Sequence, residues 1–194
     1  HAGFVVHRMD VEENKYLSNI WLYDTLTKEY RQLTTLDSEK NFIWIDDSNI
    51  LFPSIRNQKD KEQLEKGEEF TTYYKINIYG GEANECFKIP LTVTSIEKVD
   101  DNNYLVTGVY NHNKPDSNSI EEKKDYEVLD EIPFWSNGSG FTNKKRNRLY
   151  TFNKESGDLT SITDEWTNVN SLRLNKNNSK AIIISNSYTD KMAK

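Results

Sequence analysis

The sequence predicts an all-β fold, a partial β-propeller built from four-stranded antiparallel blades. Three observations predict it. Apolar and polar residues alternate with a period of two in many short segments, as they do in half-buried strands. Several of these segments recur in one register along the chain. The recurrence has a period of about 40–45 residues once two polar insertions are removed, which is typical of propeller blades.

The shared register consists of a large apolar residue, a second one two positions later, and then Asp or Asn. Another apolar residue follows twelve positions after the first. The three copies are 21–24 leading to 33–34, 74–77 leading to 86–87, and 150–153 leading to 162–163. Their first residues are 53 and 76 positions apart, and 39 and 43 once the insertions are removed. This regularity favours a propeller over a β-sandwich, since a sandwich of short strands does not require a shared register.

Turn residues separate the two strands of each copy. Gly80 and Gly81 supply the positive φ values that a tight hairpin turn needs, and Gly157 does the same in the third copy. The first copy has Leu26, Thr27 and Lys28 at this place, so we expect it to use a different turn.

A second pattern precedes each hairpin: an apolar strand, a polar Asp, Asn or Ser turn, and another apolar strand. It covers 42–54, 95–110 and 171–186, and it completes four strands per unit. We therefore expect one partial propeller domain over 1–194. Its predicted blades are blade 1 at about 3–35, blade 2 at about 41–89 with an insertion at 57–70, blade 3 at about 93–164 with an insertion at 111–143, and the start of blade 4 at about 168–194.

About three and a half blades do not close a ring, which takes four to eight. We therefore expect the chain to be part of a longer protein. Open blade edges expose unpaired backbone groups, which predicts that two copies can pair through them as a homo-oligomer.

Composition and charge exclude several classes of protein. The net charge of −6 and the pI of about 5.2 give no attraction to phosphate backbones, so we expect no nucleic-acid partner. The sequence has no apolar run long enough to span a bilayer, so we expect no membrane partner. The single cysteine, Cys86, excludes an internal disulfide and fits a cytoplasmic, reducing compartment.

Segments 14–35, 74–87 and 126–152 resemble the propellers of the prolyl oligopeptidase family of serine peptidases. Residues 126–152 are similar to an insertion of its bacterial and archaeal acylaminoacyl-peptidase-like members. In that family a propeller caps an α/β-hydrolase domain and admits only small or flexible peptides. The resemblance implies a non-catalytic, substrate-gating propeller that acts in peptide hydrolysis. It also implies a C-terminal α/β-hydrolase domain and short peptides as its partners.

The chain departs from the family in lacking the nucleophile motif G-x-S-x-G. The nearest look-alike surrounds Ser139, but it lacks the spacing and lies in a polar loop. We expect the catalytic Ser, Asp and His of the family after Lys194, so the chain alone is predicted to be inactive. No residue here is assigned a catalytic role.

Other candidate chemistry is sparse. None of the three histidines lies in a zinc-binding pattern, and His7 reads as an ordinary strand residue. The acidic pairs at 46–47 and 100–101 lack the calcium-loop pattern and read as turns. Cys86 takes the apolar position of Leu33 and Ile162, which predicts a packed core thiol. We expect no metal and no cofactor.

The two insertions differ in character. Segment 57–70 is mostly charged and reads as a solvated excursion, with one or two helical turns as the alternative. The second insertion mixes aromatic and acidic residues, and we expect Glu131, Phe134 and Trp135 to face the peptidase cavity and shape substrate entry. The alternative is that they pack back onto the blade.

Two other functions remain open at this point. A free-standing TolB-like propeller that binds a protein partner would carry the same blades without a peptidase. A sugar-handling propeller enzyme would need clustered catalytic carboxylates or histidines, which the sequence lacks.

Overall fold

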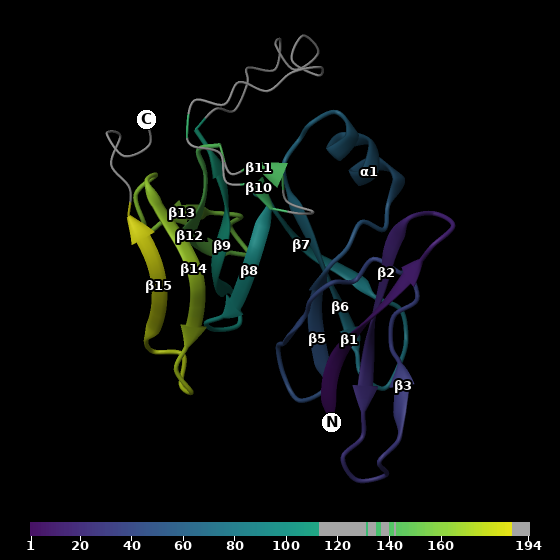
Figure 1. Ribbon diagram of the computed structural model, residues 1–194. Helices are drawn as coiled ribbons and strands as arrows, with labels where there is room; N and C mark the ends of the chain where they lie inside the picture. The colour runs from purple at the N-terminus through teal and green to yellow at the C-terminus, as the bar shows by residue number, and fades with distance from the viewer. Residues whose placement is uncertain (113–130, 132–134, 137–139, 142, 188–194) are drawn as a thin grey trace. The chain divides into compact units, whose positions relative to one another are not determined.

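Short antiparallel sheets make up most of the molecule. The computed structural model describes residues 1–112, 131, 135–136, 140–141 and 143–187 (Figure 1). The chain forms two compact units, residues 1–63 with 71–88 and residues 64–70 with 89–194. Within the described residues, no helix is long and apolar enough to cross a membrane.

The first unit holds two sheets in which every strand pairs with its neighbour in the sequence. One sheet has three strands in the order β1-β2-β3, and the other has four in the order β4-β5-β6-β7. The strands are β1 (Ala2–Asp10), β2 (Lys15–Tyr23), β3 (Tyr30–Gln32), β4 (Ile43–Trp44), β5 (Asn49–Pro53), β6 (Thr71–Asn77) and β7 (Asn84–Ile89).

The core of this unit lies between its two sheets. Ile20 and Leu22 of β2 pack against apolar residues of β5 and β6, among them Phe52 and Tyr74. Phe52 and Ile20 are completely buried. Burying such side chains contributes about 1.5–3 kcal/mol each, so this cluster holds the two sheets together.

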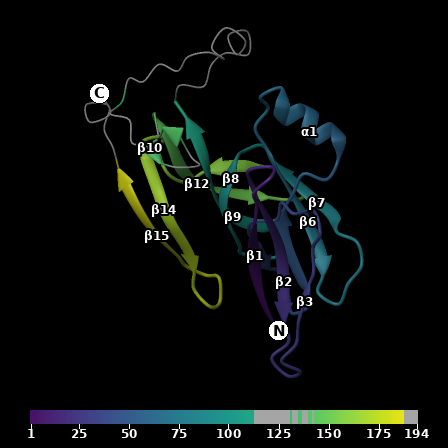
Figure 2. The ribbon, with the colours of Figure 1, turned by 45° about the vertical axis from the view of Figure 1, so that its right-hand side comes forward.

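The second unit repeats this plan. A four-stranded sheet of sequential strands, in the order β13-β12-β9-β8, lies beside the hairpin β14-β15 (Figure 2). Leu105 and Leu149 of the sheet form a core with Val169 and Leu172 of the hairpin. The strands are β8 (Val93–Lys98), β9 (Asn103–Asn111), β10 (Trp135–Ser136), β11 (Gly140–Phe141), β12 (Lys145–Asn153), β13 (Leu159–Ser161), β14 (Thr167–Leu174) and β15 (Ala181–Ser187).

The repeat predicted from the sequence is visible at the level of single hydrogen bonds. The Thr34 hydroxyl accepts a hydrogen bond from the Ile20 amide at 2.9 Å, and the Thr163 hydroxyl accepts one from the Leu149 amide at 3.1 Å. Both threonines follow the last strand of their sheet, directly after the predicted apolar position. The threonines therefore satisfy the same buried backbone donor in two repeats.

The acidic turns repeat as well. The Asp46 carboxylate accepts hydrogen bonds from the Ser48 amide at 2.8 Å and from the Asn49 side chain at 2.9 Å. Asp100 accepts the corresponding bonds from the Asn102 amide and the Asn103 side chain, at 2.9 and 3.0 Å. These side chains shape the turns as local backbone mimics, as the sequence predicted.

The expectation of a different turn in the first repeat is wrong. Lys28 has a φ of 62° and Gly157 a φ of 77°, and the amide of each donates to the backbone carbonyl four residues earlier, at Asp24 and Asn153. Both turns therefore have the same geometry. Lys28 takes the left-handed conformation because the Asp24 side chain, which accepts from the Leu26 amide at 2.8 Å, caps the turn.

The predicted fold class is confirmed: the chain is all-β, with four-stranded antiparallel sheets of the propeller-blade kind. Sequential pairing within each sheet also separates it from a sandwich, whose strands cross between sheets.

The prediction for Cys86 is wrong. This thiol is exposed, and the neighbouring Phe87 is buried at 7% exposure. Ile162, the counterpart of Cys86 in the third copy, is also exposed, at 53%. The shared spacing therefore does not decide which face of the strand is buried, because successive side chains of a strand point to opposite faces.

Candidate functional site

Both insertions connect the second and third strands of a four-stranded sheet. The first joins β5 to β6, and the second joins β9 to β12. In each sheet the hairpin turns join strands one to two and three to four, so they lie at the opposite end. The insertions thus occupy equivalent ends of their sheets, away from the acidic turns.

The first insertion is a helix rather than a solvated excursion. Helix α1 (Gln58–Glu65) begins after Asn57, whose side-chain oxygen accepts a hydrogen bond from the Asp60 amide at 2.6 Å (Figure 1). This contact caps the helix N-terminus and satisfies one of its unpaired amides. The expected solvated excursion is therefore wrong, and the alternative of one or two helical turns is confirmed.

Asp60 anchors this helix to the sheet. Its side chain is only 3% exposed, and its two oxygens accept hydrogen bonds from Lys88 Nζ at 2.6 Å and from the Thr72 hydroxyl at 2.7 Å. Burial alone would raise the pKa of this carboxyl, but the hydrogen bonds and the Lys88 charge outweigh it and lower the pKa. Asp60 was missed by sequence reasoning, because a buried Asp inside a charged run has no local signature.

Glu131 plays a similar part for the second insertion. Its carboxylate forms an ion pair with Arg146, whose side chain is 4% exposed, and accepts a hydrogen bond from the Lys144 amide. Burial acts to raise the pKa of Glu131. The ion pair with Arg146 and the hydrogen bond from the Lys144 amide lower the pKa by a larger amount, so the net shift is downward. The hydrogen bonds of this predicted gating carboxylate are therefore made within the blade.

The other two predicted gating residues are less defined. Phe134 lies outside the described residues. Trp135 lies in β10, where its backbone pairs with Phe141 of β11. The role of all three residues in substrate entry stays a prediction.

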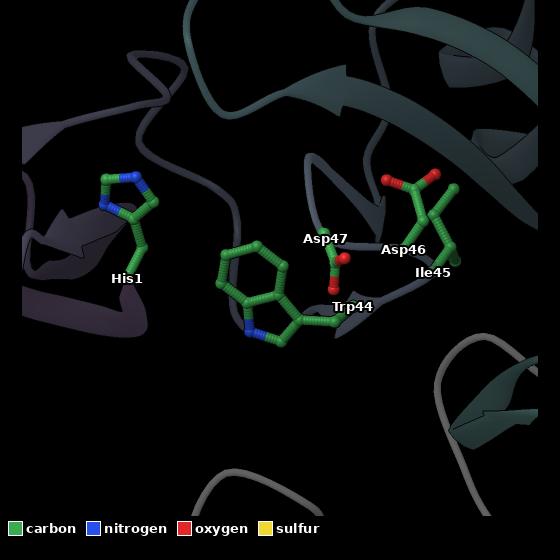
Figure 3. Close-up of a pocket in the computed structure, with 5 residues that line it drawn as sticks. All are labelled: His1, Trp44, Ile45, Asp46 and Asp47. Atoms are coloured by element: carbon green, nitrogen blue, oxygen red, sulfur yellow. The ribbon is translucent and has the colours of Figure 1, made fainter.

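One open pocket lies at the hairpin-turn end of the first unit. It has a volume of about 650 Å³ and is lined by His1, Trp44, Ile45, Asp46 and Asp47. In Figure 3 the His1 imidazole faces the Trp44 indole across the hollow, with the Asp47 carboxylate beside that indole. Asp46 serves the turn described above, so the pocket is largely a product of turn geometry.

Aromatic and cationic side chains stack on the second unit. His112 stacks on Trp166 with ring centroids 4.0 Å apart, and its Nε2 lies 2.8 Å from the Glu165 carbonyl. Arg148 lies 4.8 Å from the centre of the Tyr110 ring and donates to the Thr163 carbonyl at 2.7 Å. His112 is thus committed to packing contacts.

The described part of the chain offers little for metal binding. Among these residues, no three His, Cys, Asp or Glu side chains gather as a metal site would require. Ser139, the nearest look-alike of a nucleophile, lies outside them.

Comparison with known proteins gives a match of fold. No protein-family model and no curated protein matches this sequence. An acylaminoacyl peptidase from Pyrococcus horikoshii matches with a TM-score of 0.55 at 15% identity, over 86% of this chain and 24% of that chain. Acylaminoacyl peptidase in complex with Z-Gly-Gly-Phe-chloromethyl ketone matches at 0.54, with 15% identity and the same coverage.

The β-propeller domain of the Trilobed protease from Pyrococcus furiosus, which has an open velcro topology, is a more distant match. Its TM-score is 0.44 at 12% identity, over 86% of this chain and 41% of that one. The chain spans about a quarter of the length of the acylaminoacyl peptidases that it matches. The likeness to them shows a shared fold, which is the fold implied by the family resemblance of the sequence.

Proposed function

We propose that this chain is the non-catalytic propeller portion of an acylaminoacyl-peptidase-like serine peptidase, where it selects peptide substrates by size and shape. The observation that carries the proposal is the fold match to acylaminoacyl peptidase over 86% of the chain. The family motifs in segments 14–35, 74–87 and 126–152 support it independently.

Selection by a propeller requires a shaped rim rather than acid or base catalysis. In this proposal each insertion supplies rim surface at the end of its own sheet, opposite the hairpin turns. Phe134 and Trp135 contact the peptide in this proposal, and Glu131 holds their segment to β12 through Arg146. Helix α1 and its anchor Asp60 form the corresponding part of the four-stranded sheet of the first unit.

The partners in this proposal are an α/β-hydrolase domain of the same polypeptide and short peptides, in the cytoplasm of a bacterial cell. Peptide-bond cleavage belongs to the hydrolase domain. The isolated chain of residues 1–194 should hydrolyse neither acyl-peptides nor aminoacyl chromogenic substrates. Labelling of any of its serines by an active-site phosphonate would contradict this.

The decisive experiment uses the longer protein that its gene encodes. A G-x-S-x-G motif within a few hundred codons after Lys194 is expected, whereas further blades followed by a stop codon would indicate a free-standing interaction module. In the longer enzyme, Phe134→Ala and Trp135→Ala should change the ratio of kcat/KM between long and short acyl-peptides. Tyr16→Ala, at an exposed aromatic residue of β2, is the matched control. Tyr16→Ala should leave the ratio unchanged, and an unchanged ratio in both Phe134→Ala and Trp135→Ala would refute the gating role.

A further inference from the structure

A second hollow of the first unit combines a charged floor with an apolar wall. Its volume is about 420 Å³, near the lower end of the 300–1,000 Å³ of typical ligand pockets. Arg56, Tyr74 and Glu82 supply its polar groups, and Leu33, Ile76 and Ala83 its apolar ones. We call it the Arg56 pocket.

Arg56 has more hydrogen-bond donors than the described chain uses. Its guanidinium lies 5.2 Å from the centre of the Phe52 ring and 5.4 Å from that of Tyr74. Nη2 donates to Glu39 at 3.0 Å, while the buried Nε has no partner among the described residues. The side chain is 23% exposed. A guanidinium carries five N–H donors in a planar fork that suits a carboxylate. Because Nε is buried, a second carboxylate would bind Arg56 at the exposed part of the guanidinium, through its outer nitrogens.

Glu39 decides what kind of ligand fits. Its side chain is completely buried against Arg56, and its second carboxylate oxygen has no partner among the described residues. The pair is neutral overall, so the charge of Arg56 is balanced without a ligand. A simple anion beside Arg56 would be repelled by the Glu39 charge. A ligand that also carries a positive charge reduces this repulsion, because its own ammonium group offsets the charge of its carboxylate.

Glu82 provides the matching site for that positive charge. It is exposed at the pocket rim, after the turn in which Gly81 has a φ of 104°. Its carboxylate makes no hydrogen bond or ion pair within the part of the chain that the structure describes. A Cβ placed on Gly81 would meet no atom within 4 Å, so the rim is open. Carboxylate at the rim, guanidinium on the floor and an apolar wall together match a small apolar zwitterion.

We propose that the Arg56 pocket binds a free α-amino acid with an apolar side chain. The amino-acid carboxylate lies on Arg56, its ammonium group on Glu82, and its side chain against Leu33, Ile76 and Ala83. The site is separate from the insertions, and the proposal does not depend on the gating function.

The test is calorimetric titration of the 194-residue protein with L-phenylalanine. Saturable binding is expected, and N-acetyl-L-phenylalanine and L-phenylalanine amide, which each lack one charge, should bind about tenfold more weakly or worse. Titrations with glycine, leucine and glutamate then test the contribution of the apolar wall, and leucine is expected to bind most tightly of the three.

The variants leave the buried Glu39–Arg56 pair intact, so a loss of binding cannot be blamed on the loss of that pair. Glu82→Gln should weaken binding about tenfold, and Thr35→Trp, at an exposed threonine of the pocket lining, should abolish it. Glu155→Gln and Thr160→Trp, at exposed positions of the second unit, are the matched controls and should change nothing. Absence of saturable binding up to about 10 mM, or binding that survives both pocket variants, overturns the proposal.

Discussion

Replacing Asp60 by Asn removes the charge that ties helix α1 to the sheet beneath it. The side chain of Asp60 is 3% exposed, and it meets Lys88 Nζ at 2.6 Å and the Thr72 hydroxyl at 2.7 Å. Losing one partner of a fully buried ion pair costs about 3–5 kcal/mol. The Lys88 side chain is 36% exposed, so it can turn to water once the carboxylate is gone. We therefore expect a cost of about 2 kcal/mol, in the range of a hydrogen bond to a charged group.

The assay is urea unfolding followed by circular dichroism, and the chain offers a matched control. Asp101 pairs with Lys98 at 3.0 Å, but its side chain is 94% exposed. Asp101→Asn should change the free energy of unfolding by no more than about 0.5 kcal/mol. Equal losses of unfolding free energy for Asp60→Asn and Asp101→Asn would refute the claim that burial makes the Asp60–Lys88 pair stabilising.

The pH dependence gives a second readout for the same variant. The pKa of Asp60 is lowered in the folded protein, so its carboxylate stabilises the fold above its unfolded pKa of about 3.9. This contribution is lost as the pH falls through the lower, folded pKa. The stability difference between the native protein and Asp60→Asn should therefore shrink towards zero below about pH 4. A difference that persists at low pH would contradict the assignment.

Three further predictions concern the blades themselves. Lys28→Gly should raise the free energy of unfolding by about 1 kcal/mol, because Lys28 stands at a φ of 62°, and a lower urea midpoint would contradict this. Thr34→Val should cost about 1–2 kcal/mol in the same assay, because the buried Ile20 amide loses its acceptor, while Thr160→Val at an exposed position should be neutral. Burial raises the pKa of Tyr73, so ultraviolet titration at about pH 11 should give the same count of ionised tyrosines for native protein and Tyr73→Phe.

The features that the sequence predicted are those fixed by neighbours along the chain. Thr34 reaches the Ile20 amide fourteen positions away, and Asp100 reaches Asn103 only three positions away. Such contacts leave the same residue types at the same spacing in each repeat. They also fix the strand order, and hence the fold class.

The features that it did not predict depend on distant residues or on strand parity. Lys88 lies 28 positions from Asp60, and nothing near either residue indicates that they meet. The error at Cys86 arose because the repeat spacing of twelve residues does not say which face of the strand is buried. The turn at Lys28 was missed for a local reason. The Asp24 side chain caps this turn, so a lysine takes the left-handed position that composition alone assigns to glycine.

Asp60 and Glu131 each tie an insertion to its sheet, so substitutions at these two residues test stability separately from substrate selection. Arg146 is 4% exposed and Glu131 is 11% exposed, so Glu131→Gln leaves a cation buried without that carboxylate and should cost about 3 kcal/mol. Because the pKa of Glu131 is lowered, this difference should also vanish at acidic pH.

Trp135→Ala provides the contrast, since the gating proposal assigns it a contact with the substrate. In the longer enzyme, Glu131→Gln should lower the urea midpoint, and any change that it causes in the kcat/KM ratio should disappear at lower temperature, where the variant stays folded. Trp135→Ala should change the ratio of kcat/KM between long and short peptides under all these conditions. If Glu131→Gln alone alters that ratio, and does so without any loss of stability, then Glu131 touches the substrate and its role as an anchor is wrong.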